Sequence, residues 1–80
     1  MTPQSHARLD CRKDSCPIPV LRTKEALARL PPGGTLEVLT TDPMATVDIP
    51  AAVHRAGALL VSMHEDSELE TATFVIRKGP

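Results

Sequence analysis

The chain has 80 residues, 41% of them hydrophobic, and a formal net charge of -1. This length is enough for one domain with one modest core, and the near-zero charge argues against a protein that holds nucleic acid by its phosphates. Phe74 is the only aromatic residue, which also excludes the exposed aromatic platforms on which bases stack.

The N-terminal part of the chain predicts a short strand followed by a polar loop. Residues 1–6 are polar, and we expect them to form a flexible N-terminus. Residues 7–11 can form the first strand, in which Leu9 and Cys11 lie on the same face. Residues 12–15 form a polar loop that leads to the next element.

The segment Cys16-Pro17-Ile18-Pro19 predicts the beginning of a helix. We place Cys16 at the N-cap and Pro17 at the first helical position, where a missing N–H has no cost. The helix ends at the Pro-Pro-Gly-Gly sequence of residues 31–34. Its apolar stripe is made of Val20, Thr23, Leu27 and Leu30, with Ala26 beside it.

The middle of the chain predicts a second strand and a second helix. Residues 35–41 form the strand, with Leu36 and Val38 on one face. Asp48 is the expected cap of the helix, which ends at Gly57. The core positions of this helix are Ile49, Val53 and Ala56.

The C-terminal part predicts a hairpin. Residues 58–64 form the third strand, and its apolar face is expected to contain Leu59, Val61 and Met63. An acidic turn at residues 65–68 leads to the last strand at residues 69–78. The inward residues of this strand are Ala72, Phe74 and Ile76.

The predicted order is therefore β-α-β-α-β-β, an α+β fold. Because parallel crossovers are right-handed, both helices should cover the same face of a four-stranded mixed sheet, which gives a two-layer α/β sandwich. The opposite sheet face should be more polar, with Glu37, Ser62, Thr71 and Thr73 on it.

Cys16 is the principal candidate for chemistry. A thiol at a helix N-terminus faces the positive end of the helix dipole, which favours the reactive thiolate. Residues 8–29 carry six basic and three acidic side chains, whereas the chain from residue 30 onward carries three basic and seven acidic ones. This basic surrounding lowers a thiol pKa or attracts an anionic partner. The alternative is a small, buried cysteine at a helix cap.

Several segments together give the chain a family resemblance. They are Asp10, the Cys16-Pro17-Ile18-Pro19 turn, Val20-Leu21-Arg22-Thr23-Lys24, Thr41-Asp42-Pro43, Asp48-Ile49-Pro50 and Phe74-Val75-Ile76-Arg77-Lys78. In this combination the chain resembles the TusA/SirA-like family of small sulfur-carrier proteins, which are sulfurtransferases with a CPxP motif. The resemblance extends from about residue 8 to residue 78, within a single sulfur-carrier domain at residues 7–80.

The resemblance implies a persulfide shuttle within a sulfur relay. Cys16 would accept sulfane sulfur from a cysteine desulfurase or a rhodanese-like donor and pass it to a downstream acceptor protein. Family members serve tRNA thiolation, molybdenum-cofactor biosynthesis or sulfur oxidation. The persulfide on Cys16 is the only group the protein is expected to hold, so no cofactor is expected, and we expect a monomer.

Further residues are candidates for supporting this chemistry. Pro17 and Pro19 stiffen the turn that bears the sulfur. The basic residues Arg12, Lys13, Arg22 and Lys24 are candidates for holding negative charge or for docking a partner, although each is equally a solvated surface residue. Lys24 is at a position where the family commonly has a basic residue near the active turn. Lys13 replaces a frequent family glycine, which puts the geometry of the loop in question.

Two other functions stay open. If Cys11 lies within bonding reach of Cys16, the chain is a dithiol redox or thiol-switch protein; otherwise Cys11 is a strand residue. A non-catalytic regulatory binding module would use the open sheet face.

The remaining composition limits the kinds of site and location. The dispersed histidines and two cysteines have no metal-ligand spacing, so no metal is expected. The chain starts without an apolar leader and has no apolar run of membrane-spanning length. We therefore expect a cytoplasmic protein that contacts neither membrane nor nucleic acid directly.

Overall fold

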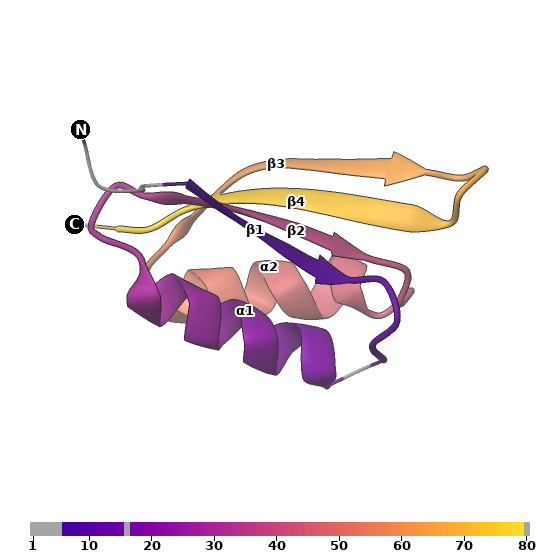
Figure 1. The fold of residues 1–80 in the computed structure, drawn as a ribbon, viewed down its shortest axis with the longest axis horizontal. Coiled ribbons are helices and arrows are strands. Elements are labelled where there is room, and N and C mark those ends of the chain that lie inside the picture. The colour runs from indigo at the N-terminus through magenta and orange to yellow at the C-terminus, as the bar shows by residue number, and fades with distance from the viewer. Residues whose placement is uncertain (1–5, 16, 80) are drawn as a thin grey trace.

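The chain forms two layers, a four-stranded sheet and two helices that both cover one of its faces (Figure 1). The structure is a computed structural model and describes residues 6–15 and 17–79. The elements are β1 (His6–Cys11), α1 (Ile18–Arg29), β2 (Thr35–Thr40), α2 (Ala45–Arg55), β3 (Leu59–Asp66) and β4 (Thr71–Arg77). The predicted α+β class, element order and placement of both helices are therefore confirmed.

The direction of the strands brings several chain segments to one end of the molecule. The strand order is β1-β2-β4-β3; β1 is parallel to β2, and β4 is antiparallel to both of its neighbours. The C-terminal ends of β1 and β2 therefore lie beside the β3–β4 turn. Figure 1 shows that α1 and α2 also begin at this end, whereas β1 begins and β4 finishes at the other. His6, predicted in the N-terminal segment, is the first residue of β1, and residues 1–5 lie outside the described residues.

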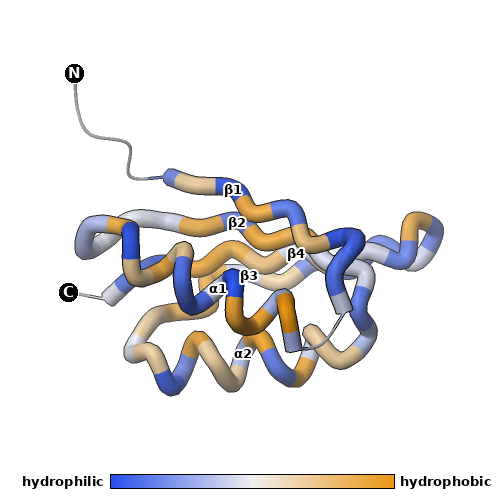
Figure 2. Tube along the Cα trace, turned by 60° about the horizontal axis from the view of Figure 1, so that its bottom comes forward, coloured by the Kyte–Doolittle hydropathy of each residue, from blue (hydrophilic) through white to orange (hydrophobic). Residues whose placement is uncertain are grey.

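The core lies between the sheet and the helices and is mainly aliphatic. Hydrophobic residues recur along the strands and on both helices (Figure 2). The strands contribute Cys11, Leu36, Val38, Ala72, Phe74 and Ile76, and the helices contribute Leu27, Ile49, Ala52 and Val53, all buried. The inward faces predicted for the second and last strands are thus confirmed, because side chains alternate along each strand.

The second helix begins earlier than predicted. α2 starts at Ala45, so Asp48 lies inside the helix and is not its cap. Asp42 holds the beginning of the helix instead: its Oδ1 accepts a hydrogen bond from the Met44 N–H at 3.1 Å, and its carbonyl accepts one from the Ala45 N–H at 3.0 Å. Ala56, predicted in the core, is exposed, because the helical stretch finishes at the preceding residue.

β3 departs from the predicted alternation at a β-bulge. The pairing register with β4 skips Val61. Met63 lies opposite Phe74, on the face that the helices cover, whereas Leu59 lies opposite Arg77, on the open face. The prediction that Leu59, Val61 and Met63 share one face is therefore wrong, since one extra residue reverses the alternation.

The open face of the sheet is mostly polar, as predicted. It includes Glu37, Ser62, Thr71 and Thr73, together with the apolar side chains of Leu39 and Val75. Arg8 Nε lies 3.3 Å from Glu37 Oε1 across the parallel β1–β2 pair.

Candidate functional site

The loop between β1 and α1 carries the predicted site. Cys16 lies outside the described residues, which include the residues on either side of it. The Ile18 N–H donates a hydrogen bond to the Ser15 carbonyl at 2.9 Å, so the two sides of the site are joined through the backbone. The Asp14 N–H donates to the Cys11 carbonyl at 3.0 Å, which turns the chain back at the end of β1.

Two prolines stiffen the beginning of α1, and this helix begins one residue later than predicted. Pro17 is the N-cap, with φ at -97°, and the helix begins at Ile18, so the predictions of Cys16 as the N-cap and of Pro17 at the first helical position are both wrong by one residue. Pro19 is buried and occupies the second position. The first turn has no acidic side chain, so no residue of that turn neutralises the positive end of the helix dipole. A thiolate close to this end of the helix is stabilised.

Asp10 and Arg12 form a two-point ion pair where the loop begins. Arg12 donates from Nε to Asp10 Oδ1 at 2.9 Å and from Nη2 to Oδ2 at 2.7 Å. The Arg12 backbone N–H also donates to Asp10 Oδ1 at 3.1 Å, so Asp10 binds the backbone at the beginning of the loop. These hydrogen bonds hold the pKa of Asp10 well below its usual range.

Three of the four basic residues that are candidates for supporting the chemistry of Cys16 line one hollow. Arg12, Lys13 and Arg22 line it together with Asp10 and Asp14, and its volume is ≈ 640 Å³. Arg22 Nη1 donates to Asp14 Oδ2 and, at 3.2 Å, to the Asp10 carbonyl. Both arginines are therefore paired with carboxylates, whereas exposed Lys13 makes no ion pair with any described residue.

Lys13 takes the place of the frequent family glycine without backbone strain. Among the described residues other than glycine, only Glu70 has a positive φ. The loop therefore does not require a left-handed conformation at Lys13, and the concern about its geometry does not apply to this chain.

Lys24 lies apart from the other three basic residues. It lines a separate hollow of ≈ 230 Å³ with Leu27, Ala28, Ala56, Ala58 and Lys78. Lys78 directly follows β4, which finishes at the end of the molecule opposite the loop (Figure 1). The structure therefore places Lys24 toward the middle of the helix layer and not beside the beginning of α1.

Cys11 is a free and completely buried thiol at the end of β1. Burial is the main cause that raises its pKa; Arg22 lowers it, while Asp14 and Asp10 raise it further. Because the thiolate is the nucleophile, Cys11 reacts poorly in the folded protein. These properties favour a strand residue of the core over a second reactive thiol.

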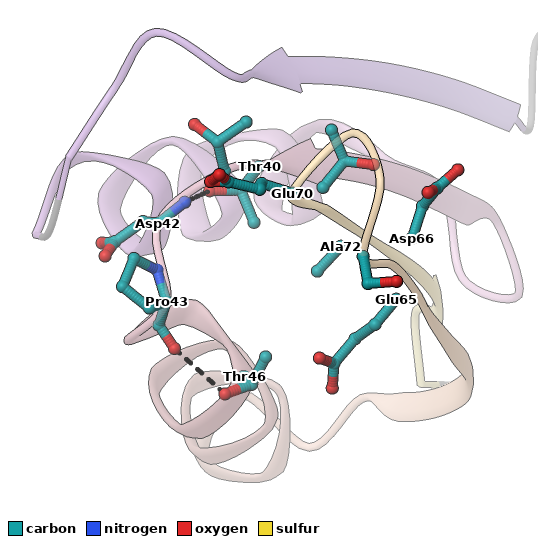
Figure 3. Close-up of a pocket in the computed structure, with 11 residues that line it drawn as sticks. Thr40, Asp42, Pro43, Thr46, Glu65, Asp66, Glu70 and Ala72 are labelled. Atoms are coloured by element: carbon teal, nitrogen blue, oxygen red, sulfur yellow. Dashed lines mark hydrogen bonds between the residues drawn. The ribbon is translucent and has the colours of Figure 1, made fainter.

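An acidic hollow at the same end of the molecule was missed by the sequence reasoning. Its volume is ≈ 300 Å³, and it lies between the β2–α2 link and the β3–β4 turn (Figure 3). Its carboxylates come from Asp42, Glu65, Asp66 and Glu70. Thr41 lines it and donates its hydroxyl to the Arg12 carbonyl at 2.6 Å, so the acidic and basic hollows adjoin. The acidic run at residues 65–70, which also forms the predicted turn, is the signal for this hollow in the sequence.

Within residues 6–15 and 17–79, no group of three or more His, Cys, Asp or Glu side chains is arranged to hold a metal ion. None of the described helices combines the length and the apolar composition needed to cross a bilayer.

Comparison with known proteins gives concordant matches in sequence and structure. The family described as sulfurtransferase TusA matches residues 7–78. The sulfur carrier protein TusA of Pseudomonas aeruginosa is 38% identical over 98% of this chain and 96% of its own length. A relative from Thermotoga maritima is 34% identical over 84% of this chain and 85% of its own length. The crystal structure of a SirA-like protein from Desulfitobacterium hafniense matches with a TM-score of 0.80 and 27% identity, over 92% of this chain and 99% of that one.

Proposed function

This chain belongs to the TusA family of sulfurtransferases, and from that premise we propose that it carries sulfane sulfur as a persulfide on Cys16 and relays it to an acceptor protein. The observation that carries the proposal is the position of Pro17, Ile18 and Pro19 at the beginning of α1, directly after the loop that follows β1. The helix dipole and the net positive hollow beside this segment favour both the thiolate and the persulfide anion.

The loading step is an exchange at sulfur. The Cys16 thiolate attacks the outer sulfur of a donor persulfide. A sulfur–sulfur bond forms at Cys16, the donor's sulfur–sulfur bond breaks, and its electron pair leaves with the donor cysteine as a thiolate. In the unloading step an acceptor thiolate attacks the outer sulfur of the Cys16 persulfide. The outer sulfur is transferred to the acceptor, and Cys16 leaves as a thiolate. Each step conserves atoms and electrons, so neither requires an added oxidant or reductant.

The partners in this proposal are proteins. The donor is a cysteine desulfurase or a rhodanese-like protein, and the acceptor belongs to a relay such as tRNA thiolation, molybdenum-cofactor biosynthesis or sulfur oxidation. Lys13 supports docking to an acidic partner surface, because it is exposed and is the cation of the basic hollow that no carboxylate pairs with among the described residues. We place the carrier in the cytoplasm as a monomer that contacts neither nucleic acid nor membrane directly.

Intact-protein mass spectrometry tests the proposal. Incubation with a cysteine desulfurase and free cysteine should add one sulfur atom, which dithiothreitol should remove. Cys16→Ser should abolish the adduct. Cys11→Ser is the matched control, because it removes the other thiol of the chain and should keep the adduct. An adduct that survives in Cys16→Ser would overturn the proposal.

A further inference from the structure

One side chain joins the segments that surround the sulfur-bearing loop. Arg22 lies on the second turn of α1, and its Nη1 atom donates to the Asp10 carbonyl, in β1, at 3.2 Å. The same atom donates to Oδ2 of Asp14, in the loop. Asp14 precedes Cys16 in the chain and Arg22 follows it, so this contact closes the chain around the Cys-Pro-Ile-Pro segment.

We propose that Arg22 and Asp14 form a clamp that positions the loop bearing Cys16. The inference rests on the proposed function and deepens it, because it assigns a task to a residue of the same site. Arg22 is then a positioning residue and not a contact for the partner protein. The planar guanidinium group suits this task, since its N–H groups reach two acceptors at once.

The composition of the loop explains why it needs a clamp. Residues 12–15 contain neither glycine nor proline, so residue type alone does not fix their backbone conformation. Polar contacts restrict the backbone conformation of this loop instead. The Thr41 hydroxyl, at 2.6 Å from the Arg12 carbonyl, holds the first half of the loop. The second half, next to Cys16, is held through Asp14.

The Arg22–Asp14 pair is only partly buried. The Asp14 and Arg22 side chains are 26% and 41% exposed. A pair this close to the surface contributes little to global stability. Its loss should therefore loosen the loop without unfolding the protein.

Positioning matters here because sulfur exchange requires the two reacting sulfurs to meet in a near-attack arrangement. A loop that samples many conformations presents Cys16 correctly for only a fraction of the time. The clamp should therefore raise the rate of transfer within the docked complex, while leaving the affinity for the partner nearly unchanged.

The test compares Arg22→Met with Arg29→Met in the full chain. Arg29 is the matched control, because it is an exposed arginine in the last turn of the same helix, away from the loop. Both variants should unfold at similar urea concentrations. In Arg22→Met, hydrogen exchange at the Asp14 amide should accelerate by about tenfold or more, because the local opening is no longer restrained. Asp14→Ala should give the same result, and the double variant should add little to either single one.

Sulfur transfer from a persulfidated cysteine desulfurase gives the second measurement. Arg22→Met should lower the rate at saturating donor by about tenfold to a hundredfold with little change in KM. A raised KM with an unchanged rate at saturating donor would show that Arg22 contacts the partner protein. This result would overturn the proposal that Arg22 positions the loop. Unchanged exchange at the Asp14 amide would also overturn it, whether or not the protein carries sulfur. If the unaltered chain took up no sulfur, the proposed function would fail, and the exchange measurement would still decide whether the clamp holds the loop.

Discussion

Thiol labelling should distinguish the two cysteines, because Cys11 can react only after the protein opens whereas Cys16 can react in the native protein. Cys11 is completely buried, and burial raises its pKa, so in the folded protein it lacks both access and thiolate character. A sulfur carrier must expose Cys16 to its partners. We therefore expect iodoacetamide to modify Cys16 in the native protein, and to modify Cys11 only when the protein opens.

The size of the protection follows from the stability of a small domain. At roughly 0.05–0.15 kcal/mol per residue, a chain of this length unfolds with about 4–12 kcal/mol. Each 1.4 kcal/mol is about a factor of ten, so the open fraction is about one in a thousand or less. Labelling of Cys11 in native buffer should therefore be slower than in concentrated urea by about a thousandfold or more.

Two variants allow each site to be measured alone. Cys16→Ser leaves only Cys11, and Cys11→Ser leaves only Cys16. The rate of mass gain is followed at one pH in native buffer and in urea. If Cys11 in native protein reacted within about tenfold of its rate in urea, the core position of this thiol would be refuted, and the dithiol alternative would regain support.

Three further results are expected. Burial raises the pKa of the Cys11 thiol, so the folded state holds the thiol proton more tightly than the unfolded state does. The free energy of unfolding should therefore fall as the pH rises above about 8.5. Cys11→Ala should reduce this dependence of the unfolding free energy on pH, as measured by urea titrations. The pKa of Asp10 is lowered in the fold, so its stabilising effect is present above about pH 3.9 and is lost as the pH falls; Asp10→Asn should flatten the acid limb, and an unchanged limb would mean that the Arg12 pair does not form in solution. Phe74→Ala should cost about 3–5 kcal/mol because the ring is fully buried, and a cost below about 1 kcal/mol would contradict the packing of the core.

Local patterns predicted the fold wherever one residue type decided the outcome. The Pro-Pro-Gly-Gly sequence after α1 and the alternation of β4 each specify an element without reference to distant parts of the chain. The bulge at Val61 was not predictable in this way, because it depends on how β3 pairs with β4 and leaves the apolar composition unchanged. The beginning of α2 was predicted wrongly for a different reason. Asp42 and Asp48 are both residues that can cap a helix, and only the tertiary structure decides between them.

The arrangement of the basic residues was not predictable from the sequence. Arg12, Lys13, Arg22 and Lys24 form one group in the sequence because they are close in the chain. The structure separates Lys24 from the others and pairs both arginines with carboxylates. Which cations remain unpaired depends on side-chain geometry across a loop and a helix, and a charge count does not contain that information.

The two ends of the described fold lie close together. His6, at the beginning of β1, and Arg77, at the end of β4, both pair with Thr35 on the intervening strand β2. These ends of β1 and β4 lie opposite the end of the molecule at which α1 begins (Figure 1). A domain with adjacent ends can be inserted into a surface loop of another protein without being stretched. This fold is therefore suited to serve as a module within a larger polypeptide, where a short tether would raise the effective concentration of a donor to the millimolar range and leave the loop between β1 and α1 at the far end from the junction.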